Sequence, residues 1–151
     1  MKRPDHTAEA RSLLALSRGS LGSLAERDGR LYPFVSLVLP AQSPDGELIL
    51  LLSDLSDHAK NLQRDARASL LLDGTLELKE PLTGPRLTLI GEVEVSSDQQ
   101  ADKARYLAVQ PEAELYAGFG DFKLYRFRIL EGLFVAGFGR IFRLKPEELK
   151  D

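Results

Sequence analysis

The sequence predicts a mainly β protein, a closed antiparallel barrel of six or seven strands with peripheral helices. Apolar stretches of strand length recur along the 151 residues, turn signals separate them, and the helical patterns between them are short. Closing such a sheet into a barrel removes its exposed edges. A doubly wound parallel sheet fits poorly, because the strands expected within residues 19–53 follow one another too closely for crossover helices. We expect a single domain over residues 1–151, with loose ends at 1–5 and 146–151.

The first third of the chain contains one predicted helix and three predicted strands. Residues Thr7 to Ser17 have helical spacing, and Thr7 can cap the helix. Strands are expected at residues 19–25, 31–39 and 47–52, where apolar side chains recur. Turn residues separate these strands at Asp28-Gly29 and at 43–46. Such short connections predict that the three strands form an antiparallel meander.

A polar corner connects the strand at 47–52 with a further strand expected at 68–72. Within it, Leu55, Ala59 and Leu62 are spaced to share one face of a short helix. Ser56 and Asp57 supply an N-cap and an acidic first turn. The chain is therefore expected to run from strand to tight corner to short helix to strand.

This corner is a candidate phosphate site, because the first amides of a helix lack intrahelical partners and favour anions. The side chains that could complete the site are those of Ser53, Ser56, His58, Lys60 and Asn61. Their hydroxyl, imidazole, ammonium and amide groups suit a phosphate monoester. The alternative is that Ser56 only caps the helix and that Lys60 is solvated.

The second half of the chain predicts the remaining strands. Residues 73–85 read as a loop, and Arg86 to Val95 alternate between apolar and polar side chains, as in a strand. Helices are expected from a cap at 96–98 to Val109, and from Pro111 to Leu115. Further strands are expected at 122–130 and 133–144, the second bent or broken at its glycines. Residues 145–151 should fray or form one helical turn.

Composition limits the classes of function. The net charge of −3 argues against a general nucleic-acid binder, which is usually strongly basic. The absence of cysteine excludes disulfides, zinc–thiolate sites and thiol catalysis. With two histidines in the chain, we predict no metal site. No apolar run approaches the ~20 residues that span a membrane, and no signal peptide opens the chain, so we expect a cytoplasmic protein without a membrane partner.

Three blocks of sequence resemble the pyridoxamine 5′-phosphate oxidase-like superfamily, and within it the haem-utilisation branch of the FMN-binding split barrels. They are Ser53 to Leu62 with Asp65 to Leu71, Arg86 to Gly91, and Asp121-Phe122 with Gly137 to Arg140. The similarity covers roughly Arg11 to Leu144 in the same order. Ala66 departs from the branch, which often has proline there. Many members of the branch carry a C-terminal domain with a haem-contacting histidine, and we expect this chain to lack that domain.

The resemblance implies a six-stranded antiparallel split barrel and a homodimer with FMN in two clefts at the interface. The phosphate-binding corner of the family maps onto Ser53, Ser56, His58, Lys60 and Asn61, and Ser36 on the preceding strand is expected to face the same cleft. The implied function is a flavin-dependent oxidoreductase of unknown substrate, in which FMN carries the electron chemistry. The alternatives are a non-catalytic split-barrel binding or regulatory module, or a protein related to haem utilisation.

The ligand count argues against histidine-ligated haem and against haem cleavage by the route of the similar branch. Haem iron takes an axial His, Cys, Met or Tyr, and this chain has no cysteine and only the initiator methionine. His6 lies near a terminus, and iron bound at His58 would compete with an anion in the corner. The four tyrosines are more simply packing residues. Flavin chemistry is therefore expected in preference to haem chemistry.

Overall fold

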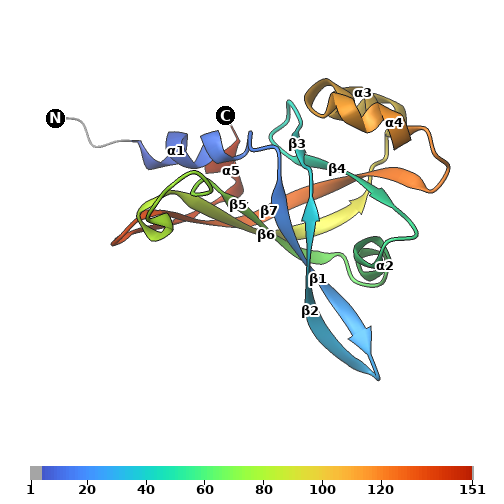
Figure 1. The fold of residues 1–151 in the computed structure, drawn as a ribbon, viewed down its shortest axis with the longest axis horizontal. Helices are drawn as coiled ribbons and strands as arrows, with labels where there is room; N and C mark the ends of the chain where they lie inside the picture. Colours follow the sequence, from blue (N-terminus) through green and yellow to red (C-terminus); the bar gives the residue numbers. More distant parts are fainter. Residues whose placement is uncertain (1–4, 151) are drawn as a thin grey trace.

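The structure, a computed structural model, describes residues 5–150 and is built on one curled antiparallel sheet (Figure 1). Its strands are β1 (Gly19–Arg27), β2 (Arg30–Val38), β3 (Ala41–Gln42), β4 (Leu48–Ser53), β5 (Arg67–Asp73), β6 (Arg86–Val95), β7 (Phe122–Gly137) and β8 (Arg140–Leu144). The helices are α1 (His6–Leu13), α2 (Asp57–Arg64), α3 (Gln99–Val109), α4 (Glu114–Ala117) and α5 (Pro146–Leu149), with 3₁₀ turns at Pro81–Thr83 and Pro111–Ala113.

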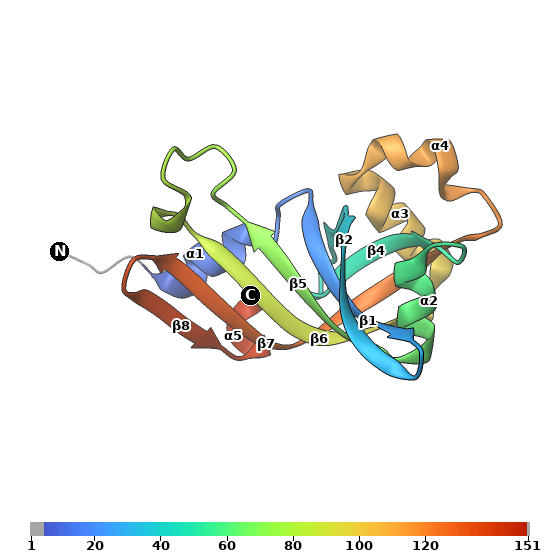
Figure 2. The ribbon, with the colours of Figure 1, turned by 60° about the horizontal axis from the view of Figure 1, so that its bottom comes forward.

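The strands follow the order β2-β1-β5-β6-β7-β4-β3, and β8 pairs with β7. The two ends of this order, β2 and β3, are separated in the chain only by Leu39 and Pro40. The sheet therefore curls until its ends meet, and the tip of the β1–β2 hairpin projects from the body (Figures 1 and 2). This is the split-barrel architecture that the sequence predicts, with eight strands rather than six or seven.

The predicted meander is wrong, because β4 does not pair with β2. The β1–β2 hairpin forms as expected, and both Asp28 (φ 53°) and Gly29 (φ 77°) adopt the positive φ that such tight turns need. After β2 the chain turns away, and β4 pairs with β7 along its whole length. Short connections indicate which strands are antiparallel hairpins, but the Leu39-Pro40 step starts a new edge of the sheet.

The longest ladder joins β6 to β7 and contains a bulge at Ile90 and Gly91. A β-carbon at Gly91 would lie 2.1 Å from the carbonyl oxygen of Arg128, so only glycine fits this close approach. The two strands predicted at 122–130 and 133–144 differ from the structure. β7 is continuous to Gly137, and the chain then reverses at Phe138 and Gly139 into β8.

Both described ends of the chain are packed against the barrel. Asp5, not Thr7, caps α1, and its carboxylate accepts hydrogen bonds from the backbone amides of Thr7 and Ala8. At the other end, the single helical turn allowed for residues 145–151 forms as α5. Its Leu149 is fully buried, so residues 146–149 are held rather than loose. The expectation for residues 1–4 and 151 lies outside the described residues.

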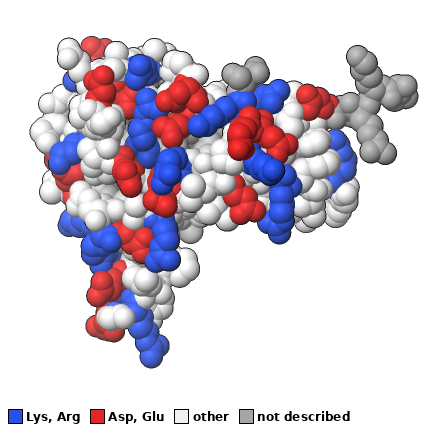
Figure 3. Space-filling model, turned by 180° about the vertical axis from the view of Figure 1, so that it is seen from behind, with Lys and Arg blue, Asp and Glu red and all other residues white. Residues whose placement is uncertain are grey.

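Figure 3 shows the face opposite that of Figure 1, where acidic and basic side chains are interspersed over the barrel and along the β1–β2 hairpin. Ion pairs between described residues include those of Arg64 with Glu26 and of Arg143 with Glu131. Within residues 5–150, no helix is long and apolar enough to cross a membrane.

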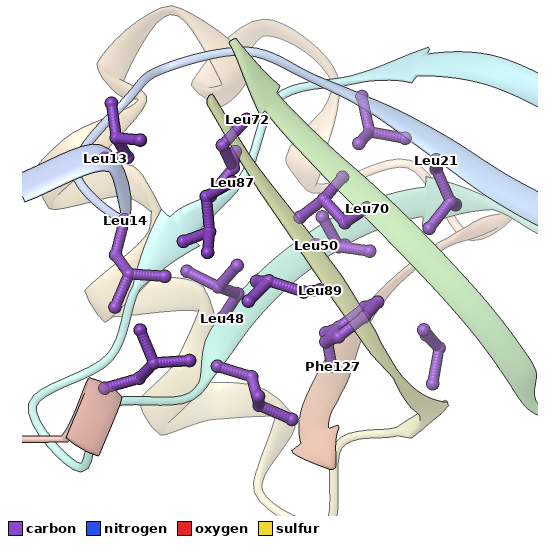
Figure 4. Packing of buried hydrophobic residues seen from close by; sticks show 14 of the residues in the cluster. Leu13, Leu14, Leu21, Leu48, Leu50, Leu70, Leu72, Leu87, Leu89 and Phe127 are labelled. Atoms are coloured by element: carbon purple, nitrogen blue, oxygen red, sulfur yellow. The ribbon is translucent and has the colours of Figure 1, made fainter. Parts of the chain in front are cut away.

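Two hydrophobic clusters lie on the two faces of β4. Leu48, Leu50 and Leu52 point into the barrel, where they join leucines of β1, β5 and β6 and Phe127 of β7 (Figure 4). Ile49 and Leu51 point outward, where Tyr106 of α3 and residues of α4 cover them. Coverage of both faces explains why β4 is an uninterrupted apolar run. The outer cluster forms one side of the cavity described next.

Candidate functional site

An apolar cavity of ≈ 390 Å³ lies beside β4, and we call it the β4 cavity. This volume is within the range of about 300–1,000 Å³ that is usual for small-molecule sites. Aliphatic and aromatic side chains form most of its wall, and three polar side chains join them. The lining residues are Leu37, Val38, Leu39, Leu50, Leu51, Leu52, Ser53, Ser56, His58, Tyr106, Tyr116 and Phe122.

The polar side chains of the β4 cavity come from the predicted corner, whose hydroxyls are already engaged. Ser53 Oγ donates to Asp121 Oδ2 at 2.6 Å and accepts from the Leu55 amide at 3.1 Å. Ser56 caps α2, because its Oγ accepts from the Ala59 amide at 3.3 Å and donates to the Ser53 carbonyl at 2.6 Å. These bonds build the turn, so the hydroxyls are not spare donors for a phosphate.

His58 supplies an imidazole to the wall of the β4 cavity. Its Nδ1 lies 2.9 Å from Ser36 Oγ, so β2 and α2 meet at this pair. Burial lowers the pKa of His58 below its usual value, and the nearby Asp57 carboxylate opposes that shift only in part. The imidazole is therefore neutral near pH 7. Among residues 5–150, no group forms a hydrogen bond with Nε2.

Lys60 and Asn61 do not line the β4 cavity. Lys60 is exposed, and it lies about 200° around the helix from His58, since each residue advances by about 100°. Asn61 is 2% exposed and faces β1. Its Nδ2 donates to Ser23 Oγ at 3.1 Å, and its Oδ1 accepts from Arg64 Nη2 at 2.9 Å. Of the six predicted site residues, the structure thus brings together Ser36, Ser53, Ser56 and His58.

The basic residue of β7 beside the corner has a partner within the protein. Lys123 Nζ lies 2.8 Å from a carboxylate oxygen of Asp54. Tyr125 also donates to Asp54, at 3.1 Å, and the Lys123 hydrogen bond holds the pKa of the Asp54 carboxyl below its usual value. This cation therefore stabilises the corner itself.

The aromatic wall of the β4 cavity was not identified from the sequence as part of a site. Tyr106 of α3 is 2% exposed, and its hydroxyl donates to the Leu39 carbonyl at 2.7 Å. Burial raises the pKa of Tyr106. Tyr116 and Phe122 pack with ring centroids 4.9 Å apart. The sequence indicates that these tyrosines pack, but it does not show that they pack around a cavity.

A buried ion pair fixes α3, and with it Tyr106, against the sheet. Arg126 of β7 donates from Nε to Asp102 Oδ2 at 2.7 Å and from Nη2 to Asp102 Oδ1 at 2.8 Å. Ser96 also donates to Asp102, at 2.6 Å. Hydrogen bonds from Arg126 hold the pKa of the Asp102 carboxyl well below its usual range, although burial opposes this. Tyr106 lies one helical turn after this anchor.

The arrangement suits a largely apolar ligand that meets one neutral imidazole. Apolar and aromatic walls bury such a ligand, and one neutral imidazole lies among them. Clusters of three or more His, Asp or Glu that could hold a bare metal ion do not occur in residues 5–150.

A protein-family model described as "CREG, beta-barrel" matches residues 1–149. Among curated proteins, "Non-canonical heme oxygenase HOZ, chloroplastic" from Arabidopsis thaliana is 36% identical over 113 residues, which are 74% of this chain and 34% of that protein. "Heme oxygenase HutZ" from Vibrio cholerae is 28% identical over 137 residues, 85% of this chain and 76% of that protein. The chain thus spans about a third of the length of the Arabidopsis relative.

Solved structures give the same fold. A heme binding protein from Mycobacterium smegmatis has a TM-score of 0.86 and 28% identity, over 99% of this chain and 61% of that chain. A Clostridium acetobutylicum protein of the pyridoxinephosphate oxidase family has a TM-score of 0.71 over 96% of this chain and 99% of that chain. Its 14% identity shows the fold alone. The predicted resemblance to the split-barrel superfamily and its haem-utilisation branch is confirmed.

The expectation that FMN is the cofactor is wrong. The two curated relatives are named as haem oxygenases and the Mycobacterium smegmatis protein as haem-binding, and none of the three is named as FMN-binding. The geometry of the corner supplies a physical reason, because the hydroxyls are used within the turn and Lys60 faces away. The matches favour the haem-related alternative over the flavin oxidoreductase.

Proposed function

The chain belongs to the CREG β-barrel family, and from this premise we propose that it binds haem, as cargo or substrate, in the β4 cavity. The observation that carries the proposal is a mostly apolar cavity with a single imidazole in its wall. Relatives named for haem support the choice of ligand. The expectation against haem rested on the small number of possible iron donors, and for His58 on competition with an anion in the corner. Because the hydroxyls of the corner are engaged within the turn, that objection to His58 no longer applies.

The walls of the β4 cavity match the chemistry of a porphyrin. The ring is flat and largely apolar, so its burial against leucine, tyrosine and phenylalanine side chains is favourable. The porphyrin would enter beside β2, where Leu37 is 67% exposed and Leu39 is 37% exposed. Histidine is a common protein donor to haem iron, and an imidazole lies in this wall.

A second copy of the chain is the partner that we propose for the outer face of β2. Leu31, Val35 and Leu37 point outward there, each more than half exposed. The pairing register extends this face over β1 and β5 to Ile90 of β6, which is 49% exposed. We call this surface the outer apolar face. Glycine and serine of β1 and β5 lie between these side chains in the register, so the face is an open surface edged by exposed apolar groups. Exposed apolar groups gathered on one face indicate an interaction site, and this face adjoins the β4 cavity at Leu37.

Haem cleavage is a second candidate function, because two of the similar proteins are named haem oxygenases. Such a reaction consumes oxygen and needs an external electron donor. Incubation of the haem complex with ascorbate in air tests it. Loss of the Soret band together with release of iron and an open-chain tetrapyrrole supports cleavage, and an unchanged Soret band supports binding alone.

Haemin titration followed at the Soret band tests the proposed function. The wild-type chain should show a saturable shift at one haemin per subunit. Leu39→Trp fills part of the β4 cavity, and overpacking of about 1–3 kcal/mol should weaken haemin by roughly tenfold or more. Leu76→Trp, at a side chain that is 67% exposed and outside the cavity, is the matched control and should bind haemin normally.

A non-saturable titration, or equal affinities for both variants, would contradict the proposed function. The first result means that haemin only adsorbs to the surface. The second means that haemin binds elsewhere than in the β4 cavity.

A further inference from the structure

His58 lies where β2 and α2 meet at the wall of the β4 cavity. It is the second residue of α2, after the Ser56 cap, so the short helix sets the direction of its side chain. Ser36 projects from the barrel-facing side of β2, and its Oγ lies 2.9 Å from His58 Nδ1. An edge strand of the sheet and a helix that follows β4 therefore fix one imidazole.

The hydrogen bond with Ser36 determines what the other ring nitrogen can do. When Nδ1 carries the proton and donates to Ser36 Oγ, Nε2 holds a free lone pair. Metal-bound histidines have this arrangement, with the second ring nitrogen donating to a neighbouring group that fixes the tautomer. Within residues 5–150, no other group engages Nε2, so the lone pair remains for a ligand.

The other possible donors are less suited to a ligand in the β4 cavity. His6 stacks on Phe142 at 4.1 Å between ring centroids, and neither residue lines the cavity. The Tyr106 hydroxyl is committed to the Leu39 carbonyl. Tyr116 is the remaining tyrosine in the wall, and tyrosine is a less common donor to haem iron than histidine.

The geometry points to His58 Nε2 as the axial donor to haem iron in the β4 cavity, with Ser36 as the residue that positions the imidazole. This inference rests on the proposed function, because it needs a porphyrin in the cavity. It goes further by naming His58 Nε2 as the atom that bonds to iron. It also assigns to Ser36 the role of positioning the imidazole without binding iron itself.

Comparison of haemin with iron-free protoporphyrin IX separates the inference from the proposed function. Both ligands fill the β4 cavity, but only haemin can bond to Nε2. The wild-type chain should bind haemin more tightly than protoporphyrin IX, and His58→Ala should remove that difference while still binding protoporphyrin IX. External imidazole should restore the wild-type Soret maximum to His58→Ala. His6→Ala is the matched control and should leave both affinities unchanged.

Ser36 is tested by a spectroscopic signature rather than by affinity alone. Resonance Raman spectra of the ferrous complex should show an iron–histidine stretch in the wild type. Ser36→Ala should shift or broaden that band and weaken haemin by about 10- to 100-fold, as loss of an outer-sphere partner does. Ser36→Thr keeps the hydroxyl and should restore the wild-type band. This variant also guards against a general defect in β2.

Each outcome decides between the two claims. Failure of both ligands to bind the wild-type chain saturably overturns the proposed function and the inference together. Saturable binding of both ligands with an identical haemin spectrum in the wild type and His58→Ala overturns the inference alone. A spectrum of tyrosinate-ligated iron, or loss of the histidine signature in His6→Ala, also overturns it. If His58→Ala does not fold, the comparison of Ser36→Ala with Ser36→Thr decides.

Discussion

Asn61 is a buried amide that joins α2 to β1 and has no contact with the β4 cavity. Removing it in Asn61→Ala leaves Ser23 Oγ, itself 3% exposed, without its donor. An unsatisfied buried polar group costs about 1–3 kcal/mol. We therefore predict that Asn61→Ala lowers the free energy of unfolding by this amount, as measured by urea denaturation.

Lys60 provides the matched control for Asn61, since the two residues are adjacent in the chain. Lys60 is exposed, and substitutions at such positions stay within about ±0.5 kcal/mol. Lys60→Ala should therefore leave the urea midpoint unchanged. Equal losses of stability in the two variants would contradict the description of the corner.

At the residue scale, spacing along the sequence predicts the helix but not the direction of every side chain. The Ser56 cap of α2 follows from local chemistry, and the structure confirms it. The packing of β1 and β2 beside α2 determines which face of the helix contacts β1 and which face lines the β4 cavity. The sequence therefore groups Lys60 and Asn61 with His58, although the barrel separates them.

Helix α3 is held to β7 by the ion pair of Asp102 with Arg126, and its contribution should depend on pH. The folded-state pKa of Asp102 is depressed, so its contribution to stability is complete above the unfolded value of about 4 and is lost as the pH falls toward the folded value. Asp102→Asn should cost on the order of 1–3 kcal/mol at pH 7. The gap between the two proteins should then narrow below about pH 4.

Urea denaturation from pH 7 to pH 3 checks this prediction. Asp98→Asn is a suitable control, because asparagine also caps helices and the exposed Asp98 side chain caps α3 through the Ala101 amide. A gap between wild type and Asp102→Asn that stays constant down to pH 3 would show that the carboxylate is not held by the guanidinium.

At the element scale, the strands are predictable where alternation or turn chemistry is local, as in the β1–β2 hairpin and β6. The pairing partner of β4 is not predictable, because an uninterrupted apolar run fits any strand of the sheet that is covered on both faces. Only the packing of α3 and α4 on Ile49 and Leu51 shows what covers the second face. The packing of α5 is equally hard to predict, because its sequence is mostly charged and contains a single leucine, Leu149, which the barrel buries.

For the molecule as a whole, the outer apolar face predicts a homodimer. A glutamate in the centre of this face would be desolvated on association, so Val35→Glu should give a monomer. An obligate interface of this kind should bury more than about 2,000 Å² in total. Light scattering after gel filtration at micromolar concentration measures the masses.

Phe138→Glu is the control for the dimer prediction, because Phe138 is 75% exposed in the turn between β7 and β8. It should keep the mass of the wild type. A monomeric wild-type chain at micromolar concentration would contradict the prediction, and it would leave the β4 cavity to be closed by the ligand alone.

The fold class follows from the sequence of the whole chain, but the ligand does not. Three sequence blocks indicate the superfamily, in which one barrel serves different ligands, so fold alone does not select between them. The ligand is selected by the wall of the β4 cavity, to which β2, β4, α2, α3 and α4 contribute side chains. No local sequence pattern predicts that these elements enclose a cavity, or that Tyr106 and Tyr116 line it.

The position of haem iron tests the central claim most directly. Ferric haem is paramagnetic and broadens the backbone amide resonances nearest to it, so NMR spectra with haemin and with zinc protoporphyrin IX can be compared residue by residue. Haem in the β4 cavity should broaden residues 36–39 and 53–58 and leave α1 and α5 sharp. Broadening centred on the β7–β8 turn, or spread evenly over the chain, would contradict the proposal that haem binds in this cavity.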